Sequence, residues 1–189
     1  GGVGYERGTG YESLFETDVE EAMYGVSAGC YLRTPFALAS TELEDLGRLI
    51  LRVRYDDGFV AYLNGVEVAR DGFAGEPRWD SVADGSRPDS EAASLVDFNI
   101  TEHIDRLRTG DNLLAIHGLN GSATSSDFLI SVELIGAEWN PEALPYLSAG
   151  AFEYADPIPL TENIHIKARL WHRGQWSALN ETTSDIPGF

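Results

Sequence analysis

The sequence predicts an all-β fold, an antiparallel β-sandwich with a short C-terminal β appendage. Three observations support this prediction. Segments of alternating polarity recur along the 189 residues, Asn64-Gly65 marks a tight hairpin turn, and polar loops join the segments without a regular βαβ rhythm. Residues 41–49 and 100–108 have a helical pattern, but both are short.

The clearest strands lie at the centre of the first half of the chain. Leu51, Val53 and Tyr55 alternate with arginines, which is the period of a half-buried strand. Residues 59–63 form a second strand, and Asn64-Gly65 then turns the chain into a third at 66–69. The remaining predicted strands are residues 30–38, 94–100, 112–119 and 127–135.

Two carboxylates, Asp56 and Asp57, stand between the first two of these strands and are followed by Gly58. Neighbours in an extended strand point to opposite faces, so the pair is poorly placed to act on the two sides of one glycosidic bond. Asp and Gly are also ordinary turn residues. We therefore interpret the pair as a corner of the sheet.

Composition restricts the partners. Thirteen Lys and Arg against thirty-one Asp and Glu give a formal charge of −18, which disfavours nucleic acid and anionic membrane surfaces. Neutral ligands are favoured, and acidic glycans would need a bridging cation such as Ca²⁺. Cys30 is the only cysteine, and no apolar stretch approaches the length of a membrane span. Because the chain opens without Met, we expect it to be a segment of a longer protein.

Two patterns suggest catalysis but lack its context. Residues 25–29 match the G-x-S-x-G nucleophile elbow, yet a strand pattern containing Pro35 follows where the elbow requires a helix. The four histidines, His103, His117, His165 and His172, show no metal-ligand spacing. We therefore expect a noncatalytic protein.

Aromatic residues in the loops suggest carbohydrate binding. Sugars stack their C–H faces on exposed rings while their hydroxyls bond polar side chains. The candidate residues are Trp79, Arg78, Tyr62, Asn120 and Trp139. The competing interpretation is that each Trp fills the core, as most tryptophans do.

An acidic stretch near the start of the chain suggests a possible Ca²⁺ site. Glu16 and Asp18 could supply the hard oxygen ligands that Ca²⁺ prefers, and Asp127 could add another. A solvated acidic turn and a strand-start cap are the alternatives, since no EF-hand spacing is present.

Several of these segments together resemble a known family. The residues are RYDDGFVAYLNGVEVAR, then WDSVAD, DFNIT and GDNLLAIHGLNGSATSSDFLISVEL, with GYESLFETDVEEAMYG and CYLRTPF upstream. They resemble the galactose-binding-like jelly-roll module of large secreted bacterial proteins, often found beside lamin-tail and CotH-type regions. The match covers roughly residues 4 to 137.

The resemblance implies a carbohydrate-binding module of a secreted or cell-surface protein, in which loops at one end of the sandwich bind a polysaccharide or oligosaccharide. It also implies a structural Ca²⁺ and other domains in the same parent chain. The alternative function is a structural spacer or protein-interaction module without a glycan site.

The C-terminal part has a different character. We expect a module at 1–137, a Pro-containing linker at 138–150, and a β segment at 151–189. That last segment resembles the later half of a fibronectin-III-associated or chitobiase C-terminal-type module. An incomplete module of this kind cannot close its own core.

Overall fold

Two β-sheets form the part of the chain that spans residues 1–138. The computed structural model describes these residues and, beyond them, only strands at 164–168, 171–172, 175–176 and 180–184. One sheet has five strands in the order β2-β1-β9-β4-β7, and the other has four in the order β3-β8-β5-β6. Their bounds are β1 Gly2–Glu6, β2 Phe15–Asp18, β3 Gly29–Leu38, β4 Leu46–Asp56, β5 Gly58–Leu63, β6 Val66–Asp71, β7 Val96–Asn99, β8 Gly110–Leu119 and β9 Asp127–Glu138.

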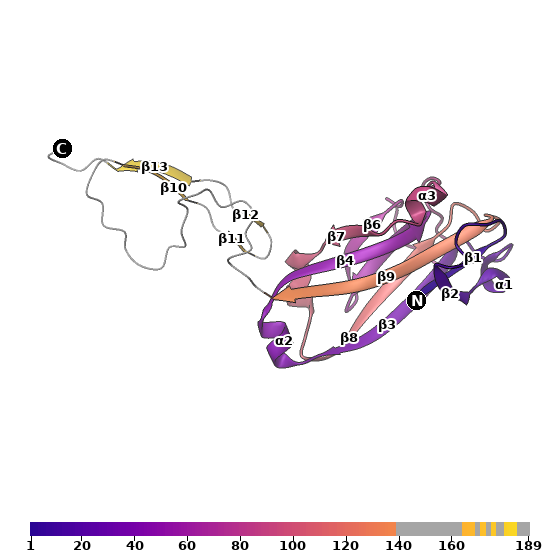
Figure 1. Cartoon of the computed structure of the whole chain (residues 1–189), viewed down its shortest axis with the longest axis horizontal. Coiled ribbons are helices and arrows are strands. Elements are labelled where there is room, and N and C mark those ends of the chain that lie inside the picture. The colour runs from indigo at the N-terminus through magenta and orange to yellow at the C-terminus, as the bar shows by residue number, and fades with distance from the viewer. Residues whose placement is uncertain (139–163, 169–170, 173–174, 177–179, 185–189) are drawn as a thin grey trace. The chain divides into compact units, whose positions relative to one another are not determined.

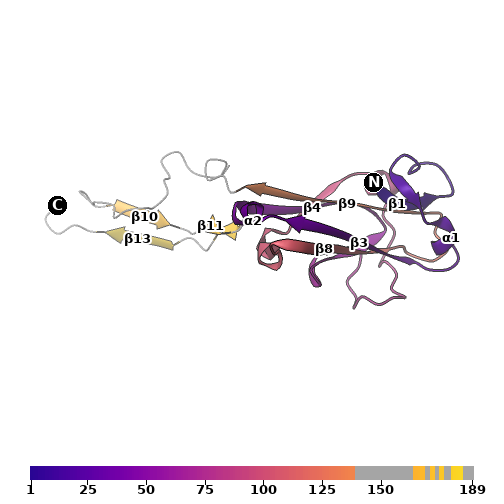
Figure 2. The ribbon, with the colours of Figure 1, turned by 90° about the horizontal axis from the view of Figure 1, so that it is seen from below.

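The two sheets pack as the layers of a sandwich (Figure 1). Figure 2 shows β1, β4 and β9 in one layer and β3 and β8 in the other. The predicted all-β sandwich is therefore confirmed. One detail differs from a purely antiparallel arrangement, because β1 pairs with β2 in parallel while its other neighbour β9 is antiparallel.

The helices are short. They are α1 Glu20–Met23, α2 Ser40–Glu44, α3 Asp89–Ala92 and the 3₁₀ helix η1 Thr101–Arg106. The two predicted helical stretches begin in α2 and η1, but the first ends early because residues 46–49 belong to β4. In the described residues, no helix is long and apolar enough to cross a membrane.

The predicted hairpin connects β5 and β6. Asn64 and Gly65 both have positive φ, at 51° and 86°, as a two-residue primed turn requires. The Asn64 side chain then ties the turn to β8: its Nδ2 donates to Asn112 Oδ1 at 2.8 Å, and its Oδ1 accepts from the Leu113 N–H at 2.8 Å. This turn therefore fixes the register of three strands.

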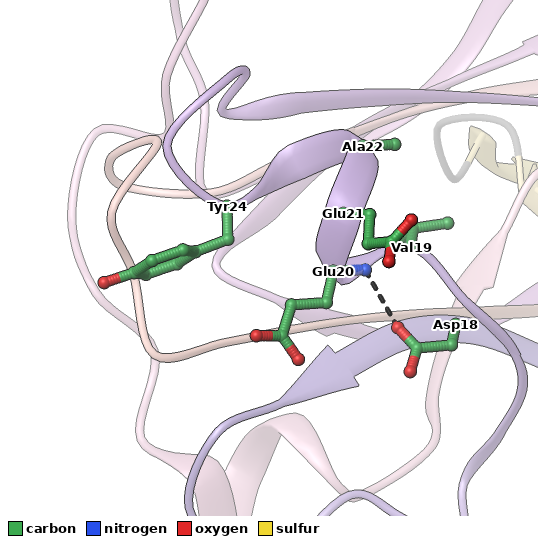
Figure 3. Close-up of a pocket in the computed structure, with 6 residues that line it drawn as sticks. All are labelled: Asp18, Val19, Glu20, Glu21, Ala22 and Tyr24. Atoms are coloured by element: carbon green, nitrogen blue, oxygen red, sulfur yellow. Dashed lines mark hydrogen bonds between the residues drawn. The ribbon is translucent and has the colours of Figure 1, made fainter.

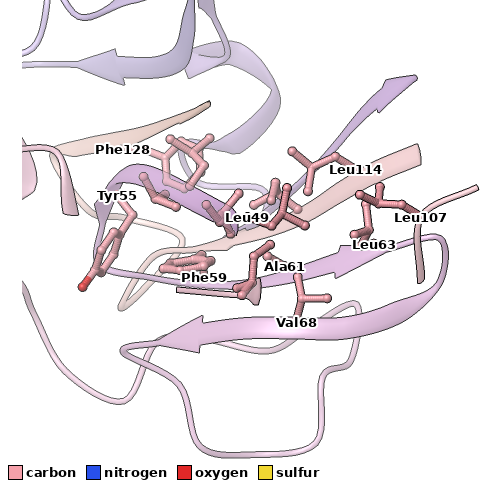
Figure 4. Packing of buried hydrophobic residues seen from close by; sticks show 14 of the residues in the cluster. Leu49, Tyr55, Phe59, Ala61, Leu63, Val68, Leu107, Leu114 and Phe128 are labelled. Carbon is pink, nitrogen blue, oxygen red and sulfur yellow. The ribbon is translucent and has the colours of Figure 1, made fainter. Parts of the chain in front are cut away.

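The core lies between the two sheets and is built from the inward faces of their strands (Figure 4). Leu51, Val53 and Tyr55 of β4 are almost completely buried, as their alternation predicts. Phe59, Ala61 and Leu63 meet them from β5, with fully buried side chains. The aromatic rings of Tyr55 and Phe59 pack edge to face across the two strands, with centroids 4.9 Å apart.

Contacts divide the chain into two units, Gly1–Glu138 and Trp139–Phe189. In the second unit, β10 Ile164–Ala168 pairs antiparallel with β13 Asn180–Ser184. A shorter pair joins β11 Trp171–His172 to β12 Gln175–Trp176. The predicted linker at 138–150 lies outside the described residues except for Glu138, so the domain boundaries and the module type of the second unit stay predictions.

Candidate functional site

Trp79 lies in the segment that follows β6 and is 76% exposed. A small turn positions it: the Arg78 N–H donates to Ser81 Oγ at 2.9 Å, and the Ser81 N–H donates to the Arg78 carbonyl at 3.1 Å. The Arg78 side chain is 74% exposed and lies 3.7 Å from Asp80. The core interpretation of this tryptophan is therefore wrong, and its ring is free to meet a ligand.

Arg78 is the direct neighbour of Trp79, and the other predicted glycan-contacting residues lie on other elements or outside the described residues. Tyr62 lies on β5 and is partly buried. Asn120 is fully buried: its Nδ2 donates to the Asp127 carbonyl at 2.8 Å and to Tyr5 Oη at 3.3 Å. It therefore anchors the sandwich end instead of facing a ligand. Trp139 lies outside the described residues.

Tyr62 instead belongs to the outer face of the four-stranded sheet. Residues paired across neighbouring strands point to the same side. One row of this face contains Arg33, Ala115, Tyr62 and Glu67, and the adjacent row contains Tyr31, His117, Val60 and Arg70. In the first row, Ala115 of β8 lies between Arg33 of β3 and Tyr62 of β5, and its side chain is the smallest of the three.

Tyr31 presents an aromatic ring on this face that the sequence analysis did not select. It is 58% exposed and lies parallel to the buried His117 ring, with centroids 4.2 Å apart and an interplanar angle of 15°. His117 fits there because Gly29 has no side chain: a Cβ at Gly29 would lie 2.9 Å from His117 Nε2. Burial lowers the pKa of His117, which favours its neutral form beneath the tyrosine.

Polar groups border the same face. Arg70 and Glu67 form a bidentate ion pair, with Nη2 2.6 Å from Oε2. Burial raises the pKa of Tyr62, and Glu67 and the nearby Tyr31 raise it further. The face thus combines exposed aromatic surface with fixed hydrogen-bonding groups, as a sugar site requires.

Hydrophobic contacts bring the base of the Trp79 segment to this sheet. Ala83 is buried against Val60 and Leu119, with Phe73 and Tyr62 packed around them. The Ala83 N–H also donates to the Asn120 carbonyl at 2.9 Å. The two ends of the segment are therefore tied to the sheet that carries Tyr31.

The acidic start of the chain forms an open depression around α1 (Figure 3). Its lining residues are Asp18, Val19, Glu20, Glu21, Ala22 and Tyr24. Asp18 Oδ1 accepts the Glu20 N–H at 2.8 Å, as the dashed line in Figure 3 shows. Arg7 contacts two of these residues: its guanidinium carbon lies 3.7 Å from the Tyr24 ring centroid, and its Nη1 lies 3.0 Å from Glu20 Oε1.

The three predicted calcium ligands, Glu16, Asp18 and Asp127, do not form a metal site in the structure. Glu16 is 83% exposed and pairs with the N-terminal amine at 3.7 Å, while Asp127 is bonded by Ser125 and Ser126. Among the residues with described side chains, no three His, Cys, Asp or Glu side chains are arranged to hold a metal ion. Structural calcium stays a prediction, and the Asp18 side chain accepts a local hydrogen bond from the Glu20 N–H where α1 begins.

The Asp56–Asp57 pair lies where the chain passes from one sheet to the other. Asp56 ends β4 and Gly58 begins β5, and the peptide bond between the two aspartates is cis. The Asp57 carboxylate accepts the Arg87 N–H at 2.7 Å and the Gly121 N–H at 2.8 Å. The predicted corner is therefore present, but it is buried. The Asp57 side chain joins it to the loop at Arg87 and the loop at Gly121.

Asp56 is in a different situation from its neighbour. Only 2% of it is exposed, its Oδ2 is buried, and the side chains of Asp57 and Tyr11 act on its carboxyl group. Burial raises the pKa of Asp56 to about 8, and the adjacent Asp57 raises it as well. Burial and the neighbouring carboxylate thus favour the protonated form of its carboxyl group.

No known family model matches the chain, and no curated protein matches it either. Two solved structures show partial similarity, a β-D-mannosidase and an α-L-rhamnosidase from Dictyoglomus thermophilum. The mannosidase is 18% identical over 48% of this chain and 9% of its own, with a TM-score of 0.32. The rhamnosidase is 16% identical over 58% of this chain and 12% of its own, with a TM-score of 0.36. Similarities this low identify neither a family nor an activity.

We predict that Asp57→Ala destabilises the protein on the order of 3 kcal/mol, because two backbone N–H groups lose a charged acceptor at a buried position. Urea unfolding followed by far-UV circular dichroism measures the change. The matched control is Asp80→Ala at an exposed position, which should change stability by no more than about 0.5 kcal/mol. Equal effects of the two substitutions would contradict the assigned role of Asp57.

Proposed function

We propose that this chain is a noncatalytic carbohydrate-binding module of a larger secreted or cell-surface protein, and that it binds a neutral polysaccharide or oligosaccharide. The observation that carries the proposal is Tyr31, an exposed ring braced on His117 in the outer face of the four-stranded sheet. A ring held in place before binding loses little conformational entropy when a ligand stacks on it.

The surroundings of Tyr31 suit a sugar. A pyranose presents an apolar C–H face, which can stack on the tyrosine ring, and hydroxyls at its edge. Arg33 on the same strand is exposed, and the Glu67–Arg70 pair lies on the same face across the sheet. These charged groups can bond hydroxyls while small Ala115 leaves room between the strands.

Trp79 supplies a second stacking surface. Its 76% exposure is high for so large an apolar side chain, and the Arg78–Ser81 turn fixes its backbone. The base of its segment packs on the sheet that carries Tyr31. We propose that Tyr31 and Trp79 contact different residues of one chain of sugars.

The electrostatics favour a neutral glycan and do not favour catalysis at the carboxylate pair. The formal charge of −18 repels uronates and sulfated sugars. A glycosidase needs two carboxyl groups that reach the opposite sides of a bond. Both Asp57 oxygens are occupied by backbone N–H groups and Asp56 is buried, so this pair supports a structural role.

We predict that Tyr31→Ala weakens glycan binding about tenfold or more, because the stacking surface is lost. Tyr31→Phe keeps the ring and should retain most of the affinity. Binding is measured by affinity electrophoresis and calorimetry with a panel of neutral polysaccharides. Tyr24→Ala removes a different exposed tyrosine, 37% exposed beside α1, and is the control that should bind as the unmodified chain does.

Trp79→Ala is expected to reduce retention on the same polysaccharide without lowering the melting temperature, because the ring is exposed at a turn. Pull-down on insoluble polysaccharide, with thermal melting of the same sample, measures both. Trp79→Tyr keeps an aromatic surface and should recover part of the retention. Loss of folding in Trp79→Ala would contradict the role of Trp79 as an exposed stacking surface. If the unmodified chain binds no polysaccharide in a broad panel, the structural spacer is favoured.

A further inference from the structure

Among the residues that the structure describes, no positively charged side chain pairs with the carboxyl group of Asp56. Its strand partner across the sheet is Leu129 of β9, and Leu129 is itself fully buried. Tyr11 packs on Leu129 from the loop that follows β1, and its hydroxyl is buried beside the Asp56 carboxyl group. A hydrogen bond with Tyr11 lowers the pKa of Asp56, but burial and the neighbouring aspartates outweigh it and raise the pKa.

The other charged and titratable groups that face this position add negative charge or none. Asp57 follows directly in the chain, and Asp127 begins β9. Asp57 raises the pKa of Asp56 through a side-chain hydrogen bond and through its charge, and Asp127 raises it through its charge. Asp89 of α3 acts in the same sense on Asp127 and on Tyr11. Tyr5 of β1 is neutral, because burial raises its pKa to about 12.

The guanidinium group of Arg87 binds Tyr55 and not Asp56. Arg87 Nη1 donates to Tyr55 Oη at 2.8 Å, and its guanidinium carbon lies 4.2 Å from the Tyr55 ring centroid. Its backbone N–H, however, donates to Asp57. Tyr55 in turn donates to Asp71 Oδ2 at 2.5 Å. Arg87 is therefore held by this corner without neutralising Asp56.

We propose that the sheet crossing at Asp56–Asp57 is a proton-controlled clamp: with a proton on Asp56, Asp57 holds the segments at Arg87 and Gly121, and release of that proton loosens both. The reason is electrostatic. A second buried negative charge beside Asp57 can be hydrated only if the corner opens, and opening breaks the two N–H bonds to Asp57. The segment before Arg87 is the one that carries Trp79.

The proposal does not depend on glycan binding. Its direction with pH follows from the raised pKa of Asp56, which is about 8 against an ordinary value near 4. Stabilisation by such a group is complete below the ordinary value and is lost as pH rises through the folded-state value. The clamp is therefore complete only below about pH 4 and weakens between roughly pH 4 and 8, the window that the two pKa values define.

The first test compares the melting temperature of the full chain with that of Asp56→Asn from pH 5 to pH 9. The amide is neutral at every pH, so the unmodified chain should lose melting temperature relative to the variant as pH rises. Asp80→Asn at an exposed position is the control and should run parallel to the unmodified chain. Parallel curves for Asp56→Asn would overturn the proposal.

The second test needs no variant at Asp56 and covers the case in which Asp56→Asn fails to fold. In ¹⁵N-labelled protein, the amide signals of Arg87 and Gly121 should shift together, with one midpoint well above the ordinary range of an aspartate. No common transition between pH 5 and pH 9 would overturn the clamp. The titration is repeated with millimolar Ca²⁺, and loss of the transition there would assign the neutralising role to a cation and also overturn the proposal.

Discussion

The chain crosses from the five-stranded sheet to the four-stranded sheet within three residues, Asp56 to Gly58, and the arrangement of one end of the sandwich depends on that crossing. β4 and β5 lie in different sheets and contribute side chains to the same core. Only Asp57 lies between the two strands, so the connection is short, and both aspartates at it are buried. A buried corner leaves polar backbone groups to satisfy, and the Asp57 carboxylate does this for Arg87 and Gly121. One side chain thereby sets the positions of two loops.

Strand β8 links this framework to the proposed binding face. Its inward residues Leu114 and Ile116 belong to the core, and its outward residues Ala115 and His117 line the outer face. Because successive residues of a strand alternate in direction, the packing that fixes β8 also fixes the support beneath Tyr31. The exposed ring is therefore positioned by the core although it does not belong to it.

Much of the fold could be predicted from alternation and turn residues, as β4, the Asn64-Gly65 hairpin and β9 show. The first strand was missed because Gly2 and Gly4 interrupt its pattern, although both are buried and Gly4 lies against the Phe128 carbonyl. Strand order and the parallel β1–β2 pair arise from contacts between distant segments.

The site was less predictable, for a similar reason. Asn120 resembles a loop residue in sequence, and only packing shows that it is buried. Tyr31 sits in an ordinary strand pattern, and its exposure depends on which face the second sheet covers. The buried state of Asp56 likewise required the tertiary structure, since the same dipeptide suits an exposed turn.

The most direct test of the glycan-binding account is a titration of the ¹⁵N-labelled chain with neutral oligosaccharides of several backbones, followed amide by amide. The account predicts that one class shifts signals along β3, β8 and β5 around Tyr31, Ala115 and Tyr62, with further shifts near Trp79. Shifts confined to the depression around α1, or none with any sugar, would contradict it.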